Sequence, residues 1–149
     1  TGCILKINQN SIIITPPEKI KSIDMTTAVY PGFPTDLQAQ WVAIMSLANG
    51  SSVVTDTVYH DRFSHIPELS RLGANIKVEN NTAFIRGKNT LVGAPVMSTD
   101  IRASASLIIV ALAAKGETQI SRVYHIDRGY ENIEQKFEGL GGDIRRISE

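Results

Sequence analysis

The sequence has few of the residues that mark specialised classes of protein. It contains one cysteine, Cys3, one tryptophan, and an aromatic fraction of only 6%. A single cysteine cannot form a disulfide within the chain, which favours a reducing, cytoplasmic setting. The longest apolar run, 107–114, is far shorter than the roughly 20 residues that a membrane-spanning helix needs. The first residues also lack the order of a secretion signal, so we expect no membrane partner.

The chain also lacks an excess of either charge. Fifteen basic and fifteen acidic side chains cancel at neutral pH, so no long-range field attracts nucleic acid, and an anion site must be a local cluster. His60, His65, His125 and Cys3 have no short metal-ligand spacing, so we expect no metal site. The sequence has no glycine-rich phosphate loop and no other cofactor motif, so we expect no cofactor.

What the sequence does contain is an internal repeat. Hydrophobic residues at 42% and charged residues at 20% are typical of a soluble globular domain with one core. Within it, the segment TDLQA at 35–39 recurs as TDIRA at 99–103. Further matches follow in the same order, with small insertions between them. Gly50 matches Gly116, Asp61-Arg62 matches Asp127-Arg128, Glu68 matches Glu134, and 72–76 matches 140–144.

The two ends of the chain fit the same repeat. Residues 2–11 align without gaps on 73–82, and 142–147 correspond to the first strand of a hairpin whose turn and return strand do not follow. We therefore expect a fragment, or a domain that another chain completes. The expected divisions are 1–33 as the tail of a preceding repeat and a connector, 34–97 as one unit, and 98–149 as a second, truncated unit.

The pattern of each unit predicts a βαβαββ order. In the first unit, Thr35 is a candidate N-cap with Gln38 as its capping-box partner, and the expected buried face is Leu37, Trp41, Ile44 and Ala48. A strand at 52–59 and a helix from Ser64 to Leu72, ended by Gly73, follow. Asparagines 80 and 81 predict the turn of a hairpin over 75–86. The second unit repeats a helix at 99–114, a strand at 118–123 and a helix at 130–140.

Charged residues recur at matching positions of the two units. Asp36 and Asp100 begin the first helix of each, and Arg62 and Arg128 follow the second strand. The aspartates are equally explained by favourable helix-start chemistry, worth about 0.3–1 kcal/mol, and the arginines by local ion pairs with Asp61 or Asp127. Arg102, on the first turn of a helix, adds a third guanidinium, and guanidinium groups suit bidentate binding of carboxylate and phosphate. We expect the other arginines that we considered to be solvent-facing, namely Arg71, Arg86, Arg122, Arg145 and Arg146.

Four stretches resemble the enolpyruvyl transferase family, and within it the UDP-N-acetylglucosamine 1-carboxyvinyltransferases. They are YPGFPTDLQAQ, HDRFSHIPELSRLGA, STDIRASASL and YHIDRGYENIEQKFEGLGGDI, and the resemblance runs from Gly2 to Ile147. It implies an inside-out α/β barrel fold, with two similar domains of three βαβαββ units each. By this resemblance the chain is a C-terminal part, about two units of one domain.

The resemblance also implies a reaction and a set of site residues. The family transfers enolpyruvyl from phosphoenolpyruvate to the 3′-hydroxyl of UDP-N-acetylglucosamine, the first committed step of peptidoglycan synthesis, by addition and elimination. Asp36 matches the expected general base, and Val58 matches a residue whose backbone holds the nucleotide sugar. Arg62 and Arg128 match arginines that bind phosphoenolpyruvate, and Asp100 and Arg102 match a charged pair facing the same cleft. The expected catalytic set is therefore Asp36, Asp100 and Arg128.

The family's catalytic cysteine, with a lysine and further arginines, lies in the other domain and outside this sequence. We therefore expect the chain alone to be inactive, to need the N-terminal part of the same enzyme as its partner, and to self-associate. Two alternatives stay open. One is the sister enzyme that acts on shikimate 3-phosphate, 3-phosphoshikimate 1-carboxyvinyltransferase, and the other is a non-catalytic interaction module.

Overall fold

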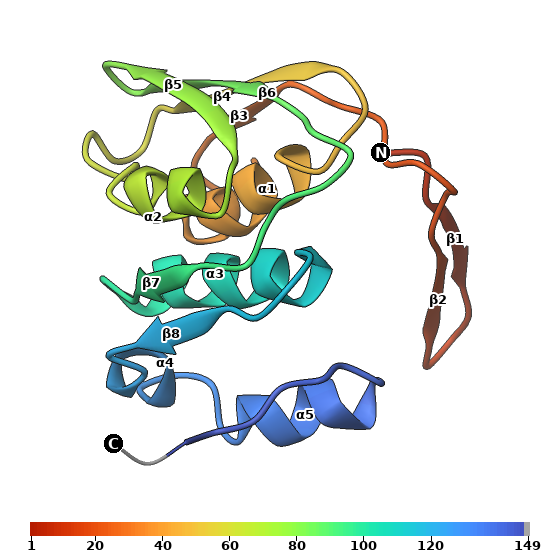
Figure 1. Cartoon of the computed structure of the whole chain (residues 1–149). Helices are drawn as coiled ribbons and strands as arrows, with labels where there is room; N and C mark the ends of the chain where they lie inside the picture. Colours follow the sequence, from red (N-terminus) through yellow and green to blue (C-terminus); the bar gives the residue numbers. More distant parts are fainter. Residues whose placement is uncertain (148–149) are drawn as a thin grey trace.

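The computed structural model describes residues 1–147 of the chain as layers of mixed α and β structure (Figure 1). A four-stranded sheet lies over helices α1 and α2, helix α3 lies on the other side of α1, and a two-stranded hairpin stands apart from these layers. In chain order the elements are β1 (Ile4–Ile7), β2 (Ile12–Thr15), β3 (Met25–Thr27), η1 (Thr35–Leu37), α1 (Gln38–Met45), β4 (Ser51–Asp56), α2 (Ile66–Arg71), β5 (Asn75–Glu79), β6 (Thr82–Arg86), β7 (Pro95–Met97), α3 (Ile101–Ala113), β8 (Gln119–Ser121), α4 (Tyr124–Asp127) and α5 (Ile133–Gly139).

The larger sheet has the order β3-β4-β6-β5. Strands β3 and β4 are parallel and are joined through α1, whereas β6 is antiparallel to both β4 and β5. The predicted hairpin is confirmed, with Asn80 at a positive φ of 53° in its turn. The predicted second helix is also confirmed, since Ile66, Leu69 and Leu72 are buried and Gly73 ends it with a φ of +90°.

The second half of the chain repeats the parallel connection. Strands β7 and β8 are parallel and are joined through α3, as β3 and β4 are joined through α1. The final helix, predicted at 130–140, is observed as α5 and begins three residues later, after Asn132, which has a positive φ of 46°. A left-handed residue does not continue an α-helix, so α5 begins only after it. The short helix α4 lies before this segment and was not predicted.

The core lies between the sheet and α3, with α1 and α2 inside it. Its fully buried large side chains include Met45, Val54, Leu69, Ile85 and Leu107. Burying one such side chain stabilises the fold by roughly 1.5–3 kcal/mol. The buried face predicted for α1 is wrong in part, because Leu37 is 48% exposed while Val42 and Ala43 are fully buried. Helix α1 packs against the sheet on one side and against α3 on another, so its buried residues are not confined to a single helical face.

Both predicted helix starts are also displaced. The Thr35 hydroxyl donates to Asp56 Oδ2 at 2.6 Å instead of capping a helix, and a single turn of 3₁₀ helix precedes α1. Gln38 is buried and forms no capping box. At α3 the N-cap is Asp100, not Thr99, since the Asp100 carboxylate accepts from the backbone N–H groups of Arg102 and Ala103.

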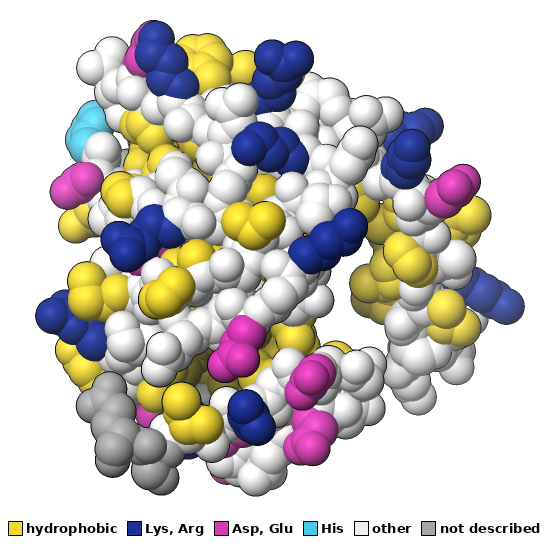
Figure 2. All heavy atoms as spheres, in the orientation of Figure 1, with side chains coloured by type: hydrophobic (Ala, Val, Ile, Leu, Met, Phe, Trp, Pro, Cys, Tyr) yellow, Lys and Arg dark blue, Asp and Glu magenta, His cyan; other side chains and the backbone are white. Residues whose placement is uncertain are grey.

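The hairpin β1–β2 exposes apolar side chains on both of its faces. Four of its isoleucines, Ile4, Ile7, Ile12 and Ile14, are more than 60% exposed. Figure 2 shows the hairpin as a separate ridge with apolar side chains on its surface. Within residues 1–147, no helix is long and apolar enough to cross a bilayer.

Candidate functional site

Three segments that are far apart in the sequence form a small charged cleft. They are the η1–α1 start, the loop between β4 and α2, and the first turn of α3. We call this site the arginine cleft, and its main side chains are Thr35, Gln38, Arg62, His65, Asp100 and Arg102. The space within it is about 40 Å³, which is room for a few waters or a small oxyanion.

Asp36 stands at the mouth of the cleft and joins two of its arginines. Its Oδ1 lies 3.2 Å from Nη1 of Arg102 and 3.5 Å from Nη1 of Arg62. The Asp36 side chain is 71% exposed, so these contacts add little stability, but they hold the carboxylate between two guanidinium groups. The predicted grouping of Asp36, Arg62 and Arg102 at one opening therefore occurs in this structure.

The Arg62 side chain is packed more deeply than the carboxylate it faces. It is 13% exposed, and its guanidinium carbon lies 4.6 Å from the centre of the Tyr59 ring. This cation–π contact fixes the guanidinium without using its hydrogen-bond donors. Nε of Arg62 is buried without a hydrogen-bond partner among the described residues, and Nη1 has only the 3.5 Å ion-pair contact with Asp36. Arg62 does not form the local ion pair with Asp61 that was the alternative for it.

Asp100 and Arg102 form the α3 side of the cleft. Oδ1 of Asp100 accepts from the Arg102 and Ala103 backbone at 2.8 and 3.1 Å and lies 3.4 Å from Nε of Arg102. The position of Asp100 is therefore explained by its role as the N-cap of α3, which was the structural alternative to a functional role. The same contacts orient the Arg102 guanidinium toward Asp36.

One residue that organises the cleft was not predicted from the sequence. Asp56, at the end of β4, is fully buried and accepts from the Thr27 and Thr35 hydroxyls at 2.8 and 2.6 Å. It also accepts from the backbone N–H groups of Val58 and Tyr59 at 3.0 and 2.9 Å. Asp56 thus ties the residue before Asp36 to the loop that leads to Arg62.

These contacts decide the charge state of Asp56. Burial by itself raises the pKa of the Asp56 carboxyl group. The hydrogen bonds from Thr35, the Tyr59 backbone, Thr27 and the Val58 backbone lower this pKa, and together they outweigh the effect of burial. The net pKa lies below the ordinary value, so the group is a carboxylate at neutral pH. A signal was present in the sequence, because an acid that ends a buried strand needs such partners.

The structure places the two remaining predicted residues differently. Val58 is 40% exposed and precedes Tyr59 of the cleft, and its N–H is already bonded to Asp56, so its backbone could bind a ligand only through the carbonyl. Arg128 is exposed at the end of α4 and does not line the cleft. Its neighbour Gly129 approaches Ile101 on the first turn of α3, which brings that backbone near the cleft.

At the second Asp-Arg position, Asp127 does not pair with its neighbour Arg128. Asp127 pairs with Arg146 through two contacts of 2.6 and 2.9 Å, and Arg146 also reaches Glu134 at 3.3 Å. The side-chain hydrogen bond from Arg146 lowers the pKa of Asp127. Arg146 is exposed, as expected of a solvent-facing charge, and it also links the C-terminal segment to α4 and α5.

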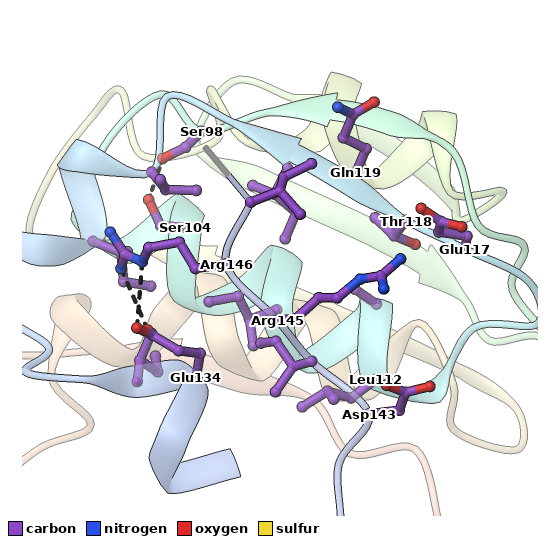
Figure 3. A pocket seen from close by; sticks show the side chains of 18 of the residues that line it. Ser98, Ser104, Leu112, Glu117, Thr118, Gln119, Glu134, Asp143, Arg145 and Arg146 are labelled. Carbon is purple, nitrogen blue, oxygen red and sulfur yellow. Dashed lines mark hydrogen bonds and ion pairs between the residues drawn. The ribbon is translucent and has the colours of Figure 1, made fainter. Parts of the chain in front are cut away.

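A larger cavity of 630 Å³ lies away from the arginine cleft, between α3, β8, α5 and residues 143–147 (Figure 3). Arg145 and Arg146 border it, while much of its lining is apolar. In the repeat, β8 corresponds to β4 and 143–147 corresponds to β5, and in the first unit β6 lies between these two strands. The cavity therefore occupies the place of a strand and is no candidate for catalysis. Residues 1–147 also contain no group of three potential metal ligands.

Comparison with known proteins gives a consistent result. Residues 2–137 match the sequence model of the family described as EPSP synthase (3-phosphoshikimate 1-carboxyvinyltransferase). Two similar proteins are named UDP-N-acetylglucosamine 1-carboxyvinyltransferase: one from Chlorobium chlorochromatii, 54% identical over 145 residues, and one from Desulfosudis oleivorans, 52% identical over 148. The alignments cover 97% and 99% of this chain but 34% and 36% of those proteins, so the chain spans about a third of their length.

Solved structures agree on the fold. The enolpyruvyl transferase NikO from Streptomyces tendae matches with a TM-score of 0.87 at 28% identity, over 97% of this chain and 34% of that one. An EPSP synthase from Acinetobacter baumannii shares the fold with a TM-score of 0.69 at 16% identity, over 98% of this chain and 35% of that one. The expected fold class is confirmed. The chain therefore belongs to the EPSP synthase family of enolpyruvyl transferases and has part of their α/β fold.

Proposed function

We propose that this chain forms one side of the active site of a UDP-N-acetylglucosamine 1-carboxyvinyltransferase. Such an enzyme moves enolpyruvyl from phosphoenolpyruvate to the 3′-hydroxyl of UDP-N-acetylglucosamine. The observation that carries the proposal is the cluster of Asp36, Arg62 and Arg102, which three separate segments bring to one cleft. Relatives with that enzyme name at more than 50% identity over nearly the whole chain support the choice of substrates.

Asp36 is the residue that would take the proton of the sugar hydroxyl. The hydroxyl oxygen bonds to the central carbon of phosphoenolpyruvate while the terminal methylene carbon gains a proton, which gives a tetrahedral intermediate. Loss of that proton and of phosphate then restores the double bond. The closest contacts of both arginines are to Oδ1 of Asp36, so Oδ2 is the oxygen that we assign to the hydroxyl.

Arg62 and Arg102 are assigned to the oxyanions of phosphoenolpyruvate. Guanidinium groups held before the ligand arrives supply both electrostatic stabilisation and positioning of the reacting atoms. The two arginines face two carboxylates, Asp36 and Asp100, so the cleft is balanced in charge without a ligand. A strongly anionic substrate thus requires more cations, and we assign Arg128 and the part of the enzyme outside this chain to that task.

Two further residues complete the proposed site. Asp100 orients Arg102, and its role in catalysis would be through that orientation. The Val58 carbonyl is assigned to the nucleotide sugar, because the Val58 N–H is already bound to Asp56. This reaction would serve peptidoglycan synthesis in the cytoplasm, and so cell wall formation, cell shape and division.

The test of this proposal is an assay of phosphate release by the full-length protein that contains this chain. Phosphoenolpyruvate is supplied with either UDP-N-acetylglucosamine or shikimate 3-phosphate as acceptor. We expect release with the nucleotide sugar only, and release with shikimate 3-phosphate only would assign the sister reaction instead. The chain of 149 residues by itself is expected to be inactive. Full-length protein that binds neither phosphoenolpyruvate nor the nucleotide sugar in calorimetry would point to a non-catalytic module.

A further inference from the structure

Of the nine buried side-chain atoms without a hydrogen-bond partner among the described residues, four belong to side chains that line the arginine cleft. They are Nε2 of Gln38, Nε2 of His65, and Nε and Nη1 of Arg62, of which Nη1 has only the 3.5 Å ion-pair contact with Asp36. Buried polar groups in folded proteins are nearly always hydrogen-bonded, so each exception calls for an explanation. Three neighbouring side chains that line one small opening have a common explanation, which is a bound group that supplies the missing partners.

Gln38 is placed as a donor to that group. It is the first residue of α1 and is 1% exposed, and it follows the turn that the Thr35–Asp56 hydrogen bond fixes. Its amide nitrogen can only donate, as can Nε of Arg62, while Nη1 of Arg62 has only the long contact with Asp36. A ligand that satisfies these neighbouring donors must be rich in acceptor atoms, as an oxyanion is.

His65 offers the opposite polarity. The ring is 2% exposed and stacks on Phe63, with 6.4 Å between ring centres. Burial lowers the pKa of His65 to about 4, although the Asp100 charge and a hydrogen bond with the Arg62 backbone act to raise it, so the ring is neutral at pH 7. We assign the proton of the neutral ring to Nδ1, so that Nε2, buried and without a partner among the described residues, is an acceptor.

We propose that Gln38 and His65 are ligand-binding residues of the Arg62 subsite. Gln38 donates to an oxyanion held by the Arg62 guanidinium, and His65 accepts from an O–H group that is bound beside it. This deepens the proposed function and rests on it, because the oxyanion is a carboxylate or phosphate of an enolpyruvyl donor. The O–H group belongs to a hydroxyl or a water that accompanies the donor.

The experiment is calorimetric titration of the full-length protein that contains this chain with phosphoenolpyruvate, inorganic phosphate and pyruvate. The two smaller anions distinguish the sources, since pyruvate provides only the carboxylate and inorganic phosphate only the phosphoryl oxygens. We expect Gln38→Glu to weaken binding of phosphoenolpyruvate about tenfold or more, because a donor to the anion becomes a charge that repels it. The control is Gln135→Glu, which makes the same change at an exposed position of α5 outside the cleft and should leave binding unchanged.

The role of His65 is tested by rescue. His65→Leu, which has no acceptor, should weaken binding severalfold, whereas His65→Gln, which keeps an acceptor oxygen, should restore most of it. Circular dichroism and urea unfolding of each variant separate a folding defect from a binding defect. His125→Gln is the matched control, because His125 is stacked on Tyr124 away from the cleft.

The outcomes distinguish this proposal from the function on which it rests. If Arg62→Ala abolishes binding while the Gln38 and His65 variants bind like the unsubstituted full-length protein, the subsite proposal is overturned and the function stands. If Arg62→Ala changes nothing, or if the folded full-length protein binds none of the three anions, both are overturned. Binding that falls with Arg62→Ala, Gln38→Glu and His65→Leu, and returns with His65→Gln, supports both.

Discussion

At the scale of single residues, the geometry of the cleft depends on a carboxylate that no ligand is expected to touch. Asp56 accepts four hydrogen bonds that come from β3, from the turn before α1 and from the loop after β4. Its own carbonyl also accepts from the Asn81 side chain at 2.7 Å. A fully buried carboxylate is tolerated because these donors replace water. The hydrogen bonds of Asp56 therefore fix the segments that carry Asp36 and Arg62.

Replacing Asp56 by asparagine tests that dependence. Asn has nearly the same shape but one fewer acceptor, so at least one buried donor loses its partner, and we expect the free energy of unfolding to fall by about 1–3 kcal/mol. Urea unfolding measures the change. Thr55→Ser, on the same strand but with its hydroxyl paired to Thr82, is the control and should cost less. A variant as stable as the parent would show that Asp56 does not organise the loops.

The same group makes stability depend on acid. The folded-state pKa of Asp56 lies below the unfolded value of 3.8, so its contribution to stability is complete above pH 3.8. The contribution is lost as the pH falls through the lower pKa of the folded state, because the unfolded chain binds the proton first. We expect the Asp56→Asn penalty, measured by urea unfolding, to shrink below pH 4. A penalty independent of pH would contradict the assigned ionisation.

Asp36 should behave in the opposite way, because its side chain is mostly exposed and its ion pairs add little stability. We expect Asp36→Ala in the full-length enzyme to leave the free energy of unfolding within about 0.5 kcal/mol of the parent. Turnover should fall by roughly 10²–10⁴-fold, the usual contribution of a general base. Steady-state phosphate release and urea unfolding measure the two effects. Unchanged turnover would remove Asp36 from the mechanism.

The sequence permitted a prediction of Asp36, Arg62, Arg102 and Arg128 at one opening, because repeated units place equivalent positions alike, and the structure groups the first three but not Arg128. The prediction did not include Asp56, Gln38 or the buried His65 as site residues. Their importance depends on which atoms remain unpaired after folding, and this follows from packing among three segments. Gln38 also matched a capping-box pattern, and the competing bond from Thr35 to Asp56 removed that role.

At the scale of elements, the cleft exists because α1 and α3 pack against each other with their starts side by side. Local patterns predicted the helices and the hairpin well, since glycine, asparagine and apolar spacing act within one element. They failed where one element meets another, as with the buried face of α1. Close backbone approaches are part of the same packing. A Cβ on Gly87, after β6, would lie 1.8 Å from the Ala48 carbonyl oxygen beyond α1.

Gly87→Ala is therefore expected to force β6 and the end of α1 apart. Backbone atoms cannot move aside as a flexible side chain can, so we expect a loss of about 1–3 kcal/mol in the free energy of unfolding. Gly139→Ala is the control, because Gly139 lies in α5 and an added Cβ would meet nothing within 4 Å. That variant should be as stable as the parent or slightly more stable, as alanine favours helix. Equal stability of both variants in urea would contradict the close packing.

At the scale of the whole molecule, the hairpin β1–β2 differs from the rest of the surface because it exposes many apolar side chains close together. Leu5, Ile7, Ile12 and Ile14 share one face, as the register of the hairpin shows. In the repeat they correspond to Ile76, Val78, Ala83 and Ile85, and the last two of these are buried beneath the sheet. The face thus has the composition of a core surface but lies in solvent, where contiguous apolar patches promote association.

We therefore expect the purified chain to self-associate through this hairpin. The apparent mass in light scattering should rise with concentration, and replacing Ile12 and Ile14 together by threonine should bring it back to the monomer. Threonine keeps the strand preference of isoleucine, so the hairpin itself should persist. Leu140→Thr removes an equally exposed but isolated apolar side chain and should leave association unchanged. A parent chain that stays monomeric at high concentration would show that the hairpin is tolerated in water.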